Sequence, residues 1–549
     1  MREKVVKVHT DDNIIVALED LRKGEVISSL GEDYRIMFDI QAKHKFARHD
    51  LQKGDPVIMY GVVVGMARHN IVQGEPITTK NVIHKTGDFL HKKVLYNWET
   101  PDVRKWRDRT FMGYHRKDGK VGTANYWIVA PLVFCENRNI GVIRESMMHQ
   151  LGYRDAKSQA LDIGPLVQAY QKSESNESIQ NVVLPKRKVG KESRLFPNVD
   201  GIKFLTHHLG CGGTRNDAQM LCELIAGYIT NPNVAGATIL GLGCQNAEQK
   251  LLEEAILKRD PNSTKPVIFH EQQQSVNEEE FIADVIKSTF IGLKEANKIE
   301  RAPATLSKLV VGLECGGSDG FSGISANPAL GYASDLINAL GGATILSEFP
   351  ELHGIEQELL HRIENELQAK RFMELMTAYA TRAKQAGSGF EANPSPGNIK
   401  DGLITDAMKS AGAAKKGGTA PIVDVLDYTE PVTKQGLNLL CTPGNDVEST
   451  TALAGSGANM IVFTTGLGTP TGNPVAPTIK VGSNTTLFKK MADIIDIDAG
   501  TIITGEATIE QVGKEILEFI IKVASGEVMT KAQQLQQDDF IPWKRDVSL

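Results

Sequence analysis

Cysteine, aromatic residues and net charge are all scarce in this sequence. The 549 residues include six cysteines, too few and too dispersed for a disulfide framework, so we expect reduced thiols. No CxxC pair is present, which excludes a zinc ribbon or a thioredoxin-type motif. The formal net charge is only −6, and Lys and Arg are scattered along the chain. This distribution argues against a nucleic-acid partner.

Long apolar runs are missing as well. No uninterrupted run approaches the ~20 residues that span a bilayer, and the N-terminus lacks the apolar core of a signal peptide. We therefore expect no membrane partner and a cytoplasmic location.

The chain is predicted to fold as three domains, spanning residues 1–95, 96–305 and 306–549. Residues 1–95 contain short β-type segments separated by Gly-Asp and Gly-Glu turns, and the segments 50–57 and 70–77 repeat one pattern. Residues 86–108 have no clear period and read as a linker that lies on another part of the protein.

The other two domains are predicted to be α/β. From about residue 125, apolar runs alternate with helical patterns, and this alternation restarts near 301–308. Such a pattern is typical of parallel sheets covered by helices on both faces. We expect a Rossmann-like variant of the parallel sheet in the C-terminal domain, and a polar surface loop at 173–197.

Four cysteines fall at predicted strand ends, where α/β sheets bind ligands. Cys315 follows "VVGLE" and Cys211 follows "THHLG", each leading into two glycines, while Cys244 and Cys441 end two other runs. A lone cysteine is more often a small buried hydrophobe, so a structural role stays open for each of them.

The stretch "SEFPELHGIE" supplies carboxylates and an imidazole after another predicted strand. Glu348, Glu351 and His353 suit a divalent metal or general acid–base chemistry. The alternative is a solvated acidic helix start. The long loops 389–405 and 463–484 are expected to bind a ligand. Neither has the glycine pattern of a nucleotide site.

Several motifs together resemble those of the altronate and galactarate dehydratase family, nearly from end to end. They are "GYHRKDGKVGTANYW", "THHLGCGGT", "GLECGGSDGFSGISANPALG", "SEFPELHG", "NPSPGNIKDGLIT" and "FTTGLGTPTGNPVAPTIKVGSN", and their wording is closest to the altronate branch. Residues 42–75 similarly resemble the family's N-terminal SAF, or β-clip, domain. The chain departs from the family at 76–82, "PITTKNV", where Thr78 or a neighbour and Lys80 replace two histidines.

The resemblance implies a metal-dependent hydro-lyase that converts D-altronate to 2-dehydro-3-deoxy-D-gluconate and water. It implies Fe(2+), with Mn(2+) as a second option and an iron–sulfur cluster as a lower-ranked alternative, and a homodimer that takes a small sugar acid. Galactarate dehydratase, a sulfo-lyase on the same scaffold and a non-catalytic sugar-acid-binding protein remain open alternatives.

The resemblance and the strand-end placement together give three sets of candidate site residues. The catalytic candidates are His207, His208, Glu348, Glu351 and His353. The metal-binding candidates are Cys211, Cys244, Cys315 and Cys441. The substrate-binding candidates are His44, Lys45, Arg116, Ser318, Asp319, Asn327, Asn393, Asn398, Thr465, Asn473 and Lys480.

Overall fold

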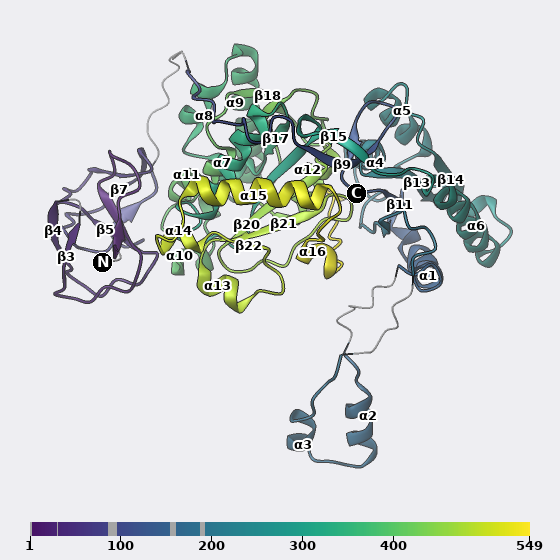
Figure 1. Cartoon of the computed structure of the whole chain (residues 1–549), viewed down its shortest axis with the longest axis horizontal. Coiled ribbons are helices and arrows are strands. Elements are labelled where there is room, and N and C mark those ends of the chain that lie inside the picture. The colour runs from purple at the N-terminus through teal and green to yellow at the C-terminus, as the bar shows by residue number, and fades with distance from the viewer. Residues whose placement is uncertain (1–2, 30, 86–95, 154–160, 187–192, 549) are drawn as a thin grey trace.

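The computed structural model describes residues 3–29, 31–85, 96–153, 161–186 and 193–548. Figure 1 shows an N-terminal β region at one side, a large α/β region in the middle and a second α/β region at the other side. The α/β class and the N-terminal β domain are thus confirmed. No helix in the described part of the chain is long and apolar enough to cross a membrane.

The N-terminal domain is built from three small antiparallel sheets. Their strands are β1 (Val5–Val6), β2 (Ile14–Ala17) and β5 (Lys45–Ala47); β3 (Val26–Ser29) and β4 (Glu32–Arg35); and β6 (Pro56–Met59), β7 (Val62–Ala67) and β8 (Val82–Ile83). The repeated segments pair with each other, because Leu51 and Ile71 exchange two backbone hydrogen bonds of 2.8 Å. Gly54 and Gly74 make the matching turns with φ of 93° and 79°, a region that favours glycine.

The second domain holds a parallel sheet in the order β12-β11-β13-β14. Its strands are β11 (Tyr126–Pro131), β12 (Gly201–Phe204), β13 (Val234–Gly241) and β14 (Val267–Glu271), and its helices are α1 (Asn137–Met148), α4 (Arg215–Thr230), α5 (Gln249–Arg259) and α6 (Glu278–Ala296). A separate antiparallel sheet joins β10 (Val121–Gly122), β9 (Thr110–His115) and β15 (Ala302–Thr305). Strand β15 therefore returns to the start of this domain.

An arm carrying two short helices projects from the second domain (Figure 1). The helices are α2 (Gly164–Gln171) and α3 (Asn176–Gln180), so the expected loop at 173–197 includes a helical turn. Part of that expected loop, residues 187–192, lies outside the described residues.

The linker rests on the C-terminal domain, as the sequence predicts for its described part. The Tyr96 hydroxyl and the Trp98 indole both donate to Thr419. Trp106 is buried and donates to Glu518 at 2.9 Å. Residues 86–95 of the expected linker lie outside the described residues.

The C-terminal domain contains a seven-stranded, all-parallel sheet in the order β18-β19-β17-β16-β20-β21-β22. The strands are β16 (Val310–Cys315), β17 (Ala343–Leu346), β18 (Ile422–Leu426), β19 (Gly436–Leu440), β20 (Met460–Thr465), β21 (Thr478–Gly482) and β22 (Ile497–Asp498). Strand order reverses direction at β16 and β20, and such a switch point is where open α/β sheets bind ligands. Cys315 is the last residue of β16.

Helices cover this sheet, with α15 lying across the front in Figure 1. They are α7 (Ala326–Ala339), α8 (Glu356–Arg362), α9 (Glu366–Gln385), α10 (Pro396–Lys400), α11 (Asp406–Ala414), α12 (Asp446–Gly455), α13 (Thr485–Lys490), α14 (Gly500–Ile503), α15 (Ile509–Ala524) and α16 (Lys531–Gln534). Two 3-10 turns matter for the site, η4 (Phe349–Leu352) and η6 (Lys415–Gly417).

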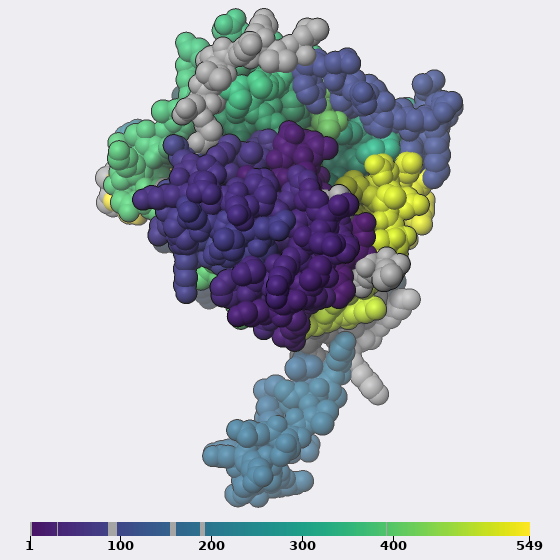
Figure 2. Space-filling model, turned by 90° about the vertical axis from the view of Figure 1, so that its left-hand side faces the viewer, coloured from purple at the N-terminus to yellow at the C-terminus, as the bar shows by residue number. Residues whose placement is uncertain are grey.

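The N-terminal domain sits against the C-terminal domain, and Figure 2 views the molecule from this side. The Thr405 hydroxyl, at the N-cap of α11, donates to the Val64 carbonyl of β7 at 2.6 Å. The buried Tyr60 ring lies against Gly412 and Gly323, and a Cβ at Gly323 would come within 2.3 Å of the Tyr60 hydroxyl. The docking therefore fixes strand β7 relative to α11.

Candidate active site

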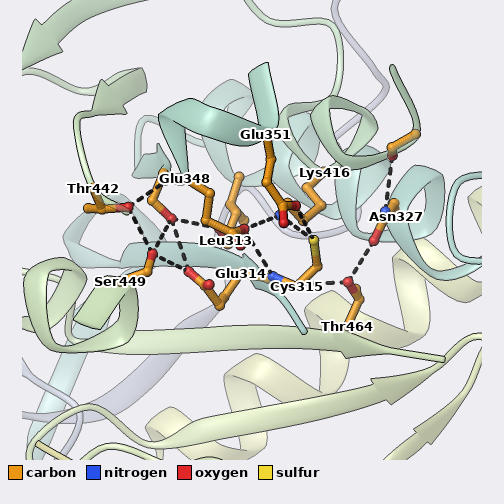
Figure 3. Close-up of polar contacts among 12 residues, drawn as sticks. Leu313, Glu314, Cys315, Asn327, Glu348, Glu351, Lys416, Thr442, Ser449 and Thr464 are labelled. Atoms are coloured by element: carbon orange, nitrogen blue, oxygen red, sulfur yellow. Dashed lines mark hydrogen bonds and ion pairs between the residues drawn. The ribbon is translucent and has the colours of Figure 1, made fainter. Parts of the chain in front are cut away.

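The end of β16 carries a thiol that is surrounded by charged groups (Figure 3). Cys315 is only 2% exposed. Its Sγ accepts a hydrogen bond from Lys416 Nζ at 2.8 Å and donates to Glu351 Oε2 at 3.4 Å. The thiol thus lies between an ammonium and a carboxylate.

Glu348 approaches this thiol from the end of β17 in a strained conformation. Its φ and ψ of 66° and 59° lie in the left-handed region, which costs about 1–3 kcal/mol for a non-glycine residue. Its backbone N–H donates to the Thr442 hydroxyl at 2.8 Å, and its carboxylate accepts from Lys416 Nζ at 2.5 Å. Both side chains are 1% exposed, so this is a fully buried ion pair.

A second pair, Glu351 and Lys409, lies nearer to solvent. Lys409 Nζ is 2.6 Å from Glu351 Oε1 and 2.8 Å from Asn393 Oδ1. The Asn393 amide donates to the same Glu351 oxygen at 3.2 Å. The Lys409 side chain is 11% exposed and Asn393 is half-buried, so this pair forms the more accessible end of the cluster.

Burial and the neighbouring charges set different protonation states on these groups. Burial, reinforced by the charge of Glu348, raises the pKa of Glu314 and of the Cys315 thiol well above their ordinary values. Burial also raises the pKa of Glu351, but attraction to Lys409 and Lys416 outweighs it and leaves the net pKa lowered. At neutral pH the Cys315 thiol is therefore protonated and Glu351 is a carboxylate, while the Glu314 carboxyl takes up a proton more readily than an exposed glutamate.

Asp446, the first residue of α12, adds a carboxyl group that titrates near neutrality. Burial, followed by the charges of Glu348 and Glu351, raises its pKa to about 7. It comes close to the Cys-Gly-Gly segment because Gly316 has no side chain: a Cβ there would lie 2.1 Å from Asp446 Oδ2. A carboxyl with this pKa suits general acid–base work.

Among the described residues, two groups of side chains have the types and spacing that could bind a metal ion. In each group the ligand atoms lie within 4.8 Å of one another: Cys315 with Glu348 and Glu351, and His84 with His353 and Asp406. In the first group the Lys416 ammonium already contacts the thiol and Glu348, so a protein cation occupies the place that an ion would need. The second group holds two imidazoles and a carboxylate, which suit Fe(II) or Mn(II).

Asp319, a predicted substrate-binding residue, forms bonds within the protein in the loop after β16. Asp319 is fully buried, accepts from the Ser322 and Ser483 hydroxyls at 2.9 Å each, and pairs with Lys43 at 3.0 Å. Its contacts hold the loop together and attach the N-terminal domain to it.

His44 and Lys45, the two candidates in the N-terminal domain, bind backbone carbonyls of the C-terminal domain. His44 Nε2 is 3.0 Å from the Lys400 carbonyl, and Lys45 Nζ donates to the Gly402 carbonyl at 2.6 Å. Burial lowers the pKa of Lys45 to about 7. These contacts serve domain docking.

Four more candidates in this region also bond within the protein. The Ser318 carbonyl accepts from the Asn398 amide at 2.7 Å, and Asn327 Oδ1 accepts from the Thr464 hydroxyl at 2.6 Å. The Thr465 hydroxyl accepts from the backbone N–H three residues later at 2.9 Å. The first and third of these bonds hold loops at the carboxyl edge of the sheet, and the second ties helix α7 to strand β20.

Three predicted substrate residues have structural partners away from the cluster. Arg116 donates to a backbone carbonyl of the second domain at 2.7 Å. The Asn473 amide donates to the Tyr228 hydroxyl at 3.1 Å, and Lys480 Nζ donates to a glutamine of the C-terminal tail at 2.7 Å.

The structure does not bring the four candidate cysteines together. Cys211 and Cys244 are exposed and follow strands of the second domain, whereas Cys315 and Cys441 are buried at the ends of β16 and β19. Within the described chain, neither of the two possible ligand groups contains more than one cysteine. An iron–sulfur cluster bound by several of these thiols is therefore disfavoured, because such clusters need converging thiolates.

The two histidines beside Cys211 are also in the second domain. His207 is buried, its Nε2 is 2.8 Å from the Pro131 carbonyl, and burial lowers its pKa to about 4. His208 is exposed and lines a small cavity of about 40 Å³ with Cys211. Of the five catalytic candidates, Glu348, Glu351 and His353 lie at the C-terminal site.

Sequence reasoning missed six charged or ligand residues that complete the two groups. They are His84, Glu314, Asp406, Lys409, Lys416 and Asp446. Glu314 could have been noticed because it directly precedes Cys315. The others stand on segments that only tertiary folding brings to their partners.

A buried acid–base cluster at the switch point of a parallel sheet, with a β domain docked beside it, defines an enzyme of the α/β class. The chain belongs to the D-galactarate/altronate dehydratase family. Three family models match it: the altronate/galactarate dehydratase SAF domain at residues 3–85, the D-galactarate dehydratase/altronate hydrolase second domain at 113–297, and the D-galactarate/altronate dehydratase C-terminal region at 306–548.

Curated relatives agree with this membership. The chain is 34% identical to an altronate dehydratase of Bacillus subtilis over 97% of each chain, and 33% identical to an altronate dehydratase of Escherichia coli over 95% of each. It is 32% identical to the L-threo-forming galactarate dehydratase of Escherichia coli, over 96% of this chain and 94% of the relative. The expected enzyme class, a lyase, is thereby confirmed.

Proposed function

We propose that this protein is a metal-dependent sugar-acid dehydratase that converts D-altronate to 2-dehydro-3-deoxy-D-gluconate and water. The observation that carries the proposal is the ionised Glu351 carboxylate, held between Lys409 and the protonated Cys315 thiol at the accessible end of the buried cluster. The two altronate dehydratases among the relatives support this choice of substrate.

The difficult step is removal of a proton from the carbon next to a carboxylate. In our proposal Glu351 takes the C2 proton, since it is the carboxylate whose pKa is lowered despite burial. Lys409 and Asn393, which flank it, bind the substrate's carboxylate and hydroxyl oxygens. Positive charge and hydrogen-bond donors placed where negative charge develops are the main source of rate enhancement in such reactions.

The C3 hydroxyl must then leave as water. Asp446 supplies its proton, because a carboxyl with a pKa of about 7 is partly protonated at neutral pH. The C3–O bond breaks as the C2–C3 double bond forms, and the enol product tautomerises to the 2-keto acid. A divalent cation, when bound by the substrate carboxylate and 2-hydroxyl, would stabilise the charge left by the C2 proton.

The test is an anaerobic assay of hexonates and hexarates with added Fe(II) or Mn(II), following the 2-keto-3-deoxy product. We expect turnover of D-altronate, and at least about a 100-fold loss in Glu351→Gln, the size typical of losing a general base. Turnover of galactarate alone would assign the chain to the galactarate branch, to which one relative belongs. Binding of sugar acids without any product would identify a non-catalytic homologue.

The proposed enzyme acts as a homodimer. Light scattering at micromolar concentration tests this part independently, and the mass of a single chain of 59.9 kDa would contradict it.

A further inference from the structure

Three ligand-type side chains meet at the junction of the N-terminal and C-terminal domains. His84 follows β8, His353 follows the turn η4, and Asp406 is the first residue of α11. Their ligand atoms lie within 4.8 Å of one another, and the two imidazole rings have centroids 5.6 Å apart. Residues separated by more than 300 positions in sequence thus converge on one point.

The fold holds His84 at this point through a chain of backbone contacts. Strand β8 pairs with β7 through Met66 and Ile83, directly before His84. Strand β7 in turn accepts a hydrogen bond from Thr405, the residue before Asp406. His84 Nδ1 contacts Asp406 Oδ1 as a result.

His353 is oriented by a second carboxylate. Its Nδ1 is 2.9 Å from Glu356 Oε1, and the other oxygen of Glu356 accepts the Gly354 N–H at 2.7 Å. A carboxylate that fixes one ring nitrogen, so that the other faces an ion, is the usual support of a metal-binding histidine.

Asp406 provides an independent sign of a missing partner. The residue is 4% exposed, and Oδ2 is buried without a hydrogen-bond partner among the described residues. Burying a carboxylate oxygen without a hydrogen-bond partner costs free energy. The position of Asp406 at the start of a helix does not give Oδ2 a partner, and His84 contacts the other oxygen, Oδ1. A bound cation would satisfy it.

We propose that His84, His353 and Asp406 bind one divalent transition-metal ion, Fe(II) or Mn(II), in place of the cysteine thiolates expected from the sequence. Two imidazoles and one carboxylate leave coordination positions open, as in the facial sites of non-haem iron proteins. Both imidazoles are about one-third exposed, at 30% and 33%, so an added ligand can reach the ion.

The ion would lie next to the acid–base cluster. His353 comes two residues after Glu351, and Asp406 comes one helical turn before Lys409 on α11, so the η4 segment and helix α11 each contribute residues to both groups. Chelation of a sugar acid by this ion rests on the proposed function, whereas metal binding itself does not. The ion would also link the two domains, because His84 belongs to the N-terminal domain whereas His353 and Asp406 belong to the C-terminal domain.

The test is a titration of metal-free, full-length protein with Mn(II) by calorimetry, and with Co(II) by visible absorption. We expect one ion per chain in the wild type. In His84→Ala and in Asp406→Asn we expect an affinity loss at least as large as the about 10- to 100-fold typical of removing a supporting partner. Asp406→Asn is nearly isosteric and retains the oxygen that accepts from the Ala407 N–H, so it is the variant that best preserves the fold.

The controls are His69→Ala, an exposed histidine of the same domain, and Cys315→Ser, and both should bind metal like the wild type. The proposal would be overturned if the wild-type protein binds no ion, or if His84→Ala and Asp406→Asn bind the ion normally. Loss of the ion in Cys315→Ser would also overturn it. If the ion binds as expected but no sugar acid is turned over, the proposed function fails while the metal site stands.

Discussion

The same Cys-Gly-Gly triplet occurs after a parallel strand in two domains, at residues 211–213 and 315–317. Cys211 is exposed beside a cavity of about 40 Å³, and the helix after it is capped by Thr214. Cys315 is buried among Glu348, Glu351 and Lys416. One local motif therefore has two quite different surroundings.

The difference lies in what the neighbouring segments bring to the strand end. Around Cys315, the segments after β17, α11 and β19 supply two lysines and several carboxyl groups. Around Cys211, the segment is bonded by the backbone of Asn246, which donates to the Gly210 carbonyl at 2.9 Å, and by the C-terminal tail, where the Thr214 hydroxyl donates to Asp546 at 2.8 Å. A strand end becomes a candidate active site only when distant charged residues converge on it.

Removal of the Lys416 ammonium should cause the largest loss of unfolding free energy among the changes that test the contrast between Cys315 and Cys211. Lys416→Met leaves Glu348 buried without its partner, and breaking a buried pair in this way costs about 3–5 kcal/mol of unfolding free energy. Activity should also be lost. Urea unfolding and a turnover assay measure both effects.

The control for this variant is Lys250→Met on α5 of the second domain. Its lysine is 80% exposed and pairs with Glu254 at 3.9 Å, so we expect a change within about 0.5 kcal/mol. Equal losses in the two variants would mean that the buried pair has no special role.

The next prediction compares the loss of unfolding free energy when a glycine of each Cys-Gly-Gly triplet is replaced by alanine. Gly316→Ala would place a Cβ 2.1 Å from Asp446 Oδ2 and 2.5 Å from the Phe463 ring, and such overpacking costs about 1–3 kcal/mol. It should also lower turnover, since Asp446 must move. In Gly213→Ala the nearest atom is 3.5 Å away, so unfolding free energy and turnover should stay near wild type. A tolerated Gly316→Ala would contradict the placement of Asp446.

The reactivity of the thiols toward an alkylating reagent gives a third comparison of the two regions. In native protein, iodoacetamide should modify Cys211 and Cys244 but leave Cys315 intact, because alkylation needs an accessible thiolate and burial raises the pKa of Cys315. Peptide mass spectrometry after a timed reaction gives the answer. Cys315 reacting as fast as Cys211 would show that the cluster opens readily.

These contrasts also indicate what the sequence can and cannot predict. The β-rich start, the two α/β regions and the position of Cys315 at a strand end follow from local patterns of apolar residues and glycines, and the structure has them. Glu351 and His353 were found because they share one short segment after a strand. Local chemistry is sufficient for such cases.

Lys416, Asp406 and His84 could not be found in this way. Lys416 stands in a plain "AAKKGG" stretch, and nothing local distinguishes it from Lys415 beside it, which is half-buried and 3.6 Å from Glu358. His84 reaches Asp406 only because β7 docks on α11. The four metal-binding cysteine candidates fall at two different sheets for the same reason, since the motif specifies a strand end and not which sheet it belongs to.

The last contrast is a difference in pH dependence between the two regions. Burial and the charges of Glu348 and Glu351 raise the pKa of Asp446 from 3.8 to about 7. Between these values the folded protein binds more protons at this group than the unfolded chain, so its contribution to unfolding free energy falls as pH rises from about 4 to about 7. Because Asp446 is only half-buried, solvent screening reduces the size of this slope.

His207, in the second domain, should give the opposite slope. Burial lowers its pKa from 6.5 to about 4, so within that window the unfolded chain binds more protons and stability rises with pH. The two slopes are isolated by subtracting the unfolding free energies of Asp446→Asn and of His207→Gln from wild type at each pH from 4 to 8. Difference curves of the same sign would contradict the assignment, because a buried acid and a buried base must respond to pH in opposite directions.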